Sequence, residues 1–124
     1  RDLALAVIDA WALLGKGDEA AAMKRLENLK ISGKFVEFIT YQQALMSEAM
    51  GKDEEAARYY RVVVRNPNVL SERLAEAANR YFTRTGNAAE SETLRKDYHA
   101  KYPDYRFSSS SEKMVRDAKD GIAE

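Results

Sequence analysis

The chain lacks cysteine and contains few residues that interrupt regular structure. With no cysteine among 124 residues, disulfides, thiolate metal ligands and a cysteine nucleophile are excluded. Two prolines and six glycines are few enough for long regular elements. Twenty Lys and Arg balance twenty Asp and Glu, and this zero net charge argues against a dedicated nucleic-acid module, which would need clustered cations. The length fits one domain or a run of small repeats.

A long hydrophobic run is also missing. The most apolar stretch, residues 3–8, is followed by Asp9 and is far shorter than the about 20 apolar residues that span a bilayer. We therefore expect a buried helix there and no membrane insertion. Because the chain begins with Arg1, we expect a mature or excised piece of a longer protein, with any targeting signal upstream. The sequence leaves a cytoplasmic and a periplasmic location equally open.

The chain has an internal period of 34 residues. Gly17 and Gly51 are 34 residues apart, and each stands between an apolar stretch and a run of acidic residues and alanine. Other small, large or helix-stopping residues repeat with the same spacing: Ala10, Ala44 and Ala78; Ala22 and Ala56; Leu26 and Tyr60; Gly33 and Pro67. Glycine after a helix provides a left-handed cap, and aspartate beyond it caps the next helix. The period therefore predicts antiparallel helix pairs that cross at alanine.

The apolar pattern predicts an all-α fold with six helices, at residues 2–15, 18–31, 34–50, 53–65, 69–85 and 87–101. In the third pair Gly86 comes one residue late, and Glu90 stands where the strict period expects alanine. For residues 105–124 we expect a linker or a short C-terminal capping helix. That segment begins with aromatic residues 105–107, continues with four serines, and ends in a weak apolar stripe.

These residues resemble the tetratricopeptide repeat, a 34-residue helix-turn-helix, and in particular its alanine-rich bacterial forms. The second repeat matches best, through Ala44, Gly51, Ala56, Tyr60 and Pro67. The resemblance covers about residues 3–36, 37–70 and 71–103. It implies that residues 1–104 form a right-handed superhelical stack of three antiparallel helix pairs. The expected structural signature is Ala10, Gly17, Ala22, Ala44, Gly51, Ala56, Tyr60, Pro67 and Ala78.

The resemblance also implies a function, because members of this family typically bind peptides or helices of partner proteins on a concave face. The first helix of each repeat lines that face. Projected onto this chain, the partner-binding residues are Val7, Trp11, Phe38, Tyr41, Leu45, Asn79 and Phe82. Their mostly apolar and aromatic character favours an amphipathic helix or hydrophobic peptide over an acidic tail. We therefore expect a non-catalytic interaction scaffold.

Two other uses of an apolar surface stay open at this point. One is self-association into a homo-oligomer, and the other is service as an accessory domain of a larger protein. We expect no enzymatic activity, no cofactor and no metal. His99 is the sole histidine, and Asp53, Glu54 and Glu55 stand at a predicted helix start, where carboxylates complement the helix dipole.

Overall fold

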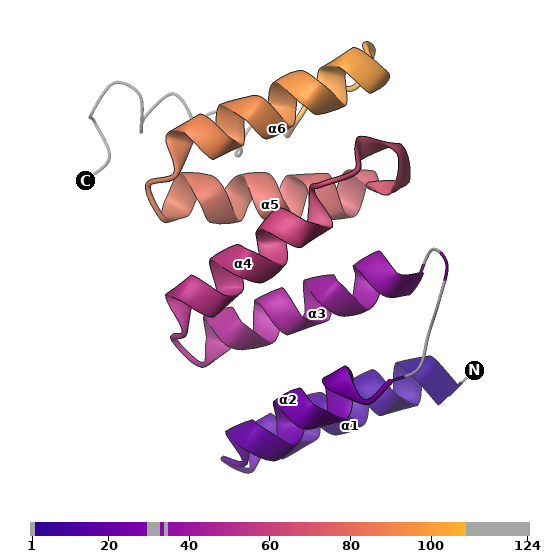
Figure 1. Ribbon diagram of the computed structural model, residues 1–124, viewed down its shortest axis with the longest axis vertical. Helices are drawn as coiled ribbons and strands as arrows, with labels where there is room; N and C mark the ends of the chain where they lie inside the picture. Colours follow the sequence, from indigo (N-terminus) through magenta and orange to yellow (C-terminus); the bar gives the residue numbers. More distant parts are fainter. Residues whose placement is uncertain (1, 30–32, 34, 109–124) are drawn as a thin grey trace. The chain divides into compact units, whose positions relative to one another are not determined.

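The computed structural model describes residues 2–29, 33 and 35–108. These residues form six α-helices and one 3₁₀ helix and contain no strand, so the predicted all-α class is confirmed for them (Figure 1). The elements are α1 (Asp2–Gly15), α2 (Glu19–Glu27), α3 (Phe35–Ala49), α4 (Asp53–Val63), η1 (Pro67–Val69), α5 (Glu72–Arg84) and α6 (Ala88–Lys101). Most of the predicted C-terminal linker or helix, residues 109–124, lies outside the described residues.

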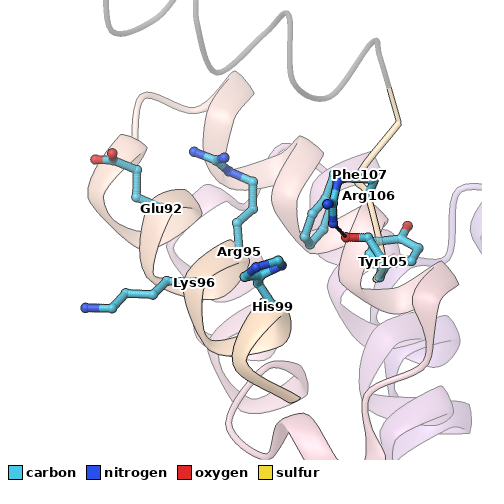
Figure 2. Close-up of a pocket in the computed structure, with 7 residues that line it drawn as sticks. All are labelled: Glu92, Arg95, Lys96, His99, Tyr105, Arg106 and Phe107. Atoms are coloured by element: carbon cyan, nitrogen blue, oxygen red, sulfur yellow. Dashed lines mark hydrogen bonds between the residues drawn. The ribbon is translucent and has the colours of Figure 1, made fainter. Parts of the chain in front are cut away.

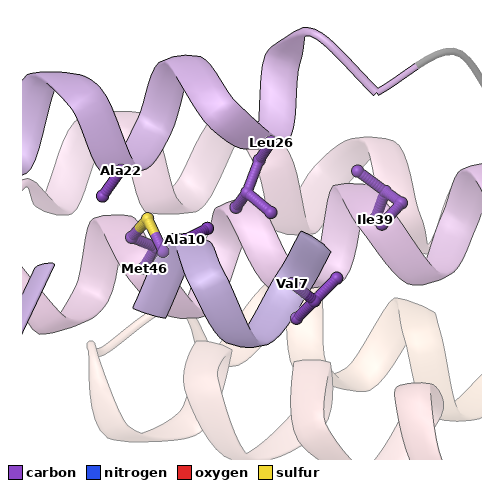
Figure 3. Close-up of a cluster of buried hydrophobic side chains, with 6 residues drawn as sticks. All are labelled: Val7, Ala10, Ala22, Leu26, Ile39 and Met46. Carbon is purple, nitrogen blue, oxygen red and sulfur yellow. The ribbon is translucent and has the colours of Figure 1, made fainter. Parts of the chain in front are cut away.

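The chain divides into two compact units, unit 1 (Arg1–Val62) and unit 2 (Val63–Glu124). In unit 1 the core cluster draws from three helices: Val7 and Ala10 of α1, Ala22 and Leu26 of α2, and Ile39 and Met46 of α3 (Figure 3). Ala10 and Ala22 have no exposed surface, which is consistent with a close crossing of α1 and α2. An exposed ion pair, Arg25 to Asp9 at 2.9 Å, also joins these helices but adds little stability because water screens it.

Alanine is also buried where α3 pairs with α4, as it is between α1 and α2. Ala44 of α3 and Ala56 of α4 are both fully buried. Next to them the hydroxyl of Tyr60 donates a hydrogen bond to Glu48 Oε1 at 2.7 Å, which satisfies the polar end of a fully buried ring.

In unit 2, α5 packs on α6 through large residues and a buried polar cluster. The apolar part comprises Leu74, Ala75, Ala78, Tyr81, Phe82, Leu94 and Tyr98. The polar part is built around Ser91, whose hydroxyl donates to Asn79 Oδ1 and lies 3.1 Å from Thr83 Oγ1. Because the serine hydrogen is used on Asn79, the Thr83 hydroxyl donates the second bond.

The three turns within the helix pairs have the same geometry. Gly17, Gly51 and Gly86 have φ of 89°, 73° and 82°, in the left-handed region where glycine is favoured. The backbone N–H after each glycine bonds a carbonyl five residues back: Asp18 to Leu13 (3.0 Å), Lys52 to Ser47 (2.9 Å) and Asn87 to Phe82 (2.7 Å). The three hairpins of the sequence therefore share one turn geometry.

The late third turn changes which residue fills the small position. Five residues after each glycine come Ala22, Ala56 and Ser91, and all three have no exposed surface. Glu90, which the strict period placed there, is partly exposed. Nine residues after each glycine come Leu26, Tyr60 and Arg95, so unit 2 has an arginine where unit 1 has buried large side chains.

Candidate functional site

Unit 1 presents a row of apolar side chains on α1 and another on α3, which we together call the α1–α3 face. It consists of Leu5, Ile8 and Trp11 on α1 and Phe38, Tyr41 and Leu45 on α3. Spacings of three and four residues place each row on one side of its helix. Leu5 and Ile8 are 58% and 60% exposed and Phe38 is 36% exposed, while the other three are partly exposed.

A hydrogen bond joins the two rows. Trp11 Nε1 donates to Gln42 Oε1 of α3 at 2.9 Å, and Gln42 lies one turn from Phe38 on the same side of the helix. The indole is thus fixed by its polar edge and still partly exposed. Val7, which the sequence placed among the partner-binding residues, is 9% exposed and belongs to the core beneath Trp11.

Tyr41 packs its ring against α4. Its ring lies 6.4 Å from the ring of Tyr60, at 59° to it, and Tyr60 is in turn fixed by Glu48. Aromatic side chains held in one rotamer lose little entropy on binding, which suits them as anchors.

The charges on α1 and α3 have one sign. The two helices contain four carboxylate residues, Asp2, Asp9, Glu37 and Glu48, and no lysine or arginine. Asp9 is neutralised by its ion pair with Arg25 of α2, which leaves Glu37 and Glu48 of α3 as the carboxylates beside the apolar row of that helix.

Two of the predicted binding residues lie instead in the core of unit 2. Asn79 has no exposed surface and Phe82 is 1% exposed, and Asn79 Oδ1 accepts the hydroxyl of Ser91 on α6. The period matched Asn79 to Trp11 and Leu45, but its side chain bonds α6 and offers no surface to a partner. The binding candidates that keep exposed surface are Trp11, Phe38, Tyr41 and Leu45 in unit 1.

Unit 2 has a feature that sequence analysis missed, a C-terminal strap formed by Tyr105–Ser108. Glu76 of α5 accepts hydrogen bonds from the Tyr105 hydroxyl, from Ser108 N at 2.8 Å and from Ser108 Oγ at 3.2 Å. The rings of Tyr105 and Phe107 meet Tyr98 edge-on, at 5.2 Å and 5.9 Å between centroids. The strap is thereby fixed on the helix pair.

These contacts make the strap sensitive to alkaline pH. Burial raises the pKa of Tyr98, helped by the nearby carboxylate of Glu72. Burial, followed by the hydrogen bond to Glu76, raises the pKa of Tyr105 well above its usual value of 10.0. A raised folded-state pKa means that the stabilisation is complete below 10.0 and is lost as pH rises through the folded-state pKa.

We therefore expect the stability of unit 2 to fall as pH rises above the ordinary tyrosine range, and Tyr105→Phe to reduce that fall. The variant keeps the ring and removes the ionising hydroxyl. Denaturant unfolding at a series of alkaline pH values, for wild type and variant, measures the slopes. Identical slopes would mean that Tyr105 does not carry the effect.

Two kinds of site are not found among the described residues. Within residues 2–29, 33 and 35–108, no three His, Cys, Asp or Glu residues are placed to hold a metal ion. None of the described helices combines the length and apolar character needed to cross a membrane.

No protein-family model matches the chain, and neither the curated proteins nor the solved structures contain a significant match. The tetratricopeptide resemblance therefore stays a prediction.

Proposed function

We propose that this chain is a non-catalytic interaction module, built from tetratricopeptide-like helix pairs, whose α1–α3 face binds an amphipathic helix of a partner protein. The observation that carries the proposal is the exposure of Leu5 and Ile8, each more than half exposed in one row with Trp11. Single exposed apolar residues are ordinary, but a row of them along one helix that also holds a fixed indole is typical of a binding site.

The anchors of this face are Trp11, Tyr41 and Leu45. All three are partly exposed; Trp11 is supported by Gln42 and Tyr41 by Tyr60, and Leu45 lies one turn from Tyr41 on the same side of α3. Aromatic and aliphatic anchors of this kind supply most of the affinity in helix-in-groove recognition.

The charges favour a partner helix with lysine or arginine beside its apolar face. Glu37 and Glu48 of α3, with no basic residue on α1 or α3, favour a cationic partner over an anionic one. Binding should therefore weaken as salt is added.

The repeated turn supports the tetratricopeptide part of the proposal. Three glycines in the left-handed region, followed after five residues by buried small side chains, are the features expected of helix pairs in one repeat family.

A synthetic peptide tests the proposal. The probe is a helix of about 18 residues, or five turns, with leucine on one side and lysine on the other, and the control is the same composition in scrambled order. Trp11 is the sole tryptophan of the chain, so its fluorescence reports on the face directly. We expect a saturable change with the helical peptide and none with the scrambled one.

The variant Tyr41→Glu with Leu45→Glu should weaken binding about tenfold or more, because two anchors are lost. Its two added carboxylates favour a cationic peptide, so the loss cannot come from repulsion. The matched control, Ala20→Glu with Val62→Glu, adds the same charge at exposed positions of unit 1 outside the face. Equal affinity in both double variants, with helicity unchanged by circular dichroism, would refute the assignment of the face.

A further inference from the structure

Unit 2 contains a cavity of about 420 Å³ between α6 and the C-terminal strap (Figure 2). Four of its lining residues bear nitrogen donors: Arg95, Lys96, His99 and Arg106. This surface is separate from the α1–α3 face of unit 1, and its lining is rich in cationic side chains where that face is apolar.

Arg95 is the central residue of this cavity. It occupies the position, nine residues after the turn glycine, that Leu26 and Tyr60 fill with buried side chains. Its Nε is buried and has no hydrogen-bond partner among the described residues. A buried donor without an acceptor is costly, so the packing of unit 2 does not by itself explain an arginine at this position.

Arg106 is held in place from the other side of the cavity. Its Nη1 donates to the carbonyls of Pro103 at 2.9 Å and Tyr105 at 3.1 Å. The strap that carries Arg106 is itself tied to Glu76 through Tyr105 and Ser108. The guanidinium is therefore positioned before any ligand arrives, which lowers the entropy cost of binding.

The residues that line the cavity carry a net charge of +2, with His99 counted as neutral. Three permanent cations, Arg95, Lys96 and Arg106, face one carboxylate, Glu92. Figure 2 shows Glu92 and Lys96 directed away from the strap, whereas Arg95 and His99 stand on the side of α6 nearer to it. A phosphate monoester carries about −1.5 to −2 charges at neutral pH, which matches this excess better than a single carboxylate does.

We propose that this cavity binds the phosphate monoester group of a small molecule. Arg95 and Arg106 donate guanidinium N–H groups to the phosphate oxygens, and His99 adds a further donor. The cavity volume falls within the range of about 300–1,000 Å³ that is usual for small-molecule sites, and it leaves room for an organic group beyond the phosphate.

Phenyl phosphate titrated into the ¹⁵N-labelled full chain tests this site. We expect saturable amide shifts confined to residues 92–99 and 105–107. Arg95→Met keeps an apolar stem and removes the charge, and it should weaken binding about tenfold or more. Lys101→Met is the matched control, because Lys101 ends the same helix outside this cavity. It should change the affinity by no more than about twofold.

Three results would overturn the proposal. The first is the absence of saturable shifts, and the second is an equal loss of affinity in Arg95→Met and Lys101→Met. The third is binding of benzoate or inorganic phosphate as tightly as phenyl phosphate. Tight benzoate binding would indicate a carboxylate site, and tight phosphate binding would indicate a site that does not recognise an organic group. If Arg95→Met does not fold, Arg106→Met replaces it, because Arg106 is exposed and its removal costs only exposed hydrogen bonds to backbone carbonyls.

Discussion

Truncation of Phe82 to alanine should lower the free energy of unfolding by about 3–5 kcal/mol, the usual cost of removing a buried aromatic ring. Phe82 is 1% exposed and packs edge-on against Tyr81, with 5.6 Å between ring centroids. Denaturant unfolding followed by circular dichroism measures the change. The same substitution at Phe38, which is 36% exposed, should cost about 1 kcal/mol.

This pair of variants separates two placements of Phe82. A residue on an open binding surface would lose little stability on truncation, as the sequence projection implied. Similar costs at Phe82 and Phe38 would contradict the burial of Phe82 in unit 2 and would return it to the binding candidates.

The reciprocal exchange Leu26→Arg and Arg95→Leu should have opposite effects, although both residues hold the same position in their helix pairs. Leu26 is 1% exposed in the core of unit 1, and an arginine there would bury a charge without a partner. We expect a loss of about 3 kcal/mol or more. Arg95→Leu removes an unpartnered buried Nε and should leave the stability of unit 2 equal or higher.

Thermal and denaturant unfolding of both variants measures this contrast, with Ala20→Arg as the control for an added charge at an exposed site of α2. A large loss of stability in Arg95→Leu would mean that Arg95 holds unit 2 together. Stability retained in Arg95→Leu but phosphate binding lost would fit a residue kept for a ligand at a cost in stability.

The helices themselves could be predicted closely because their limits are set by local chemistry. Gly17, Gly51 and Gly86 end the first helix of each pair, and their φ values agree with that role. The start of α5 was placed too early. Asn66 accepts the N–H of Asn68 and begins η1 at Pro67, and Ser71 then caps α5 through Leu74 N at 3.2 Å. These side-chain bonds favour a short 3₁₀ turn in place of the continuous helix predicted from residue 69.

The candidate site was less predictable because a period shows which residues are equivalent and does not show what covers them. Trp11, Leu45 and Asn79 are equivalent by spacing, yet Asn79 bonds Ser91 and is buried. The strap depends on contacts between Glu76 and residues some thirty positions later, which no local pattern encodes. Counting from Gly86 in place of the strict 34-residue period would have shown that Arg95 stands where the other two pairs have Leu26 and Tyr60.

The measurement that tests the central claim most directly is the mass of the chain in solution by light scattering on a sizing column, over a dilution series, with and without the amphipathic peptide. An α1–α3 face open to a foreign helix predicts the monomer mass of 14.0 kDa at every concentration and a one-to-one complex with the peptide. A stable dimer that excludes the peptide would contradict it, because the exposed apolar rows would then be the contact between two copies of this chain.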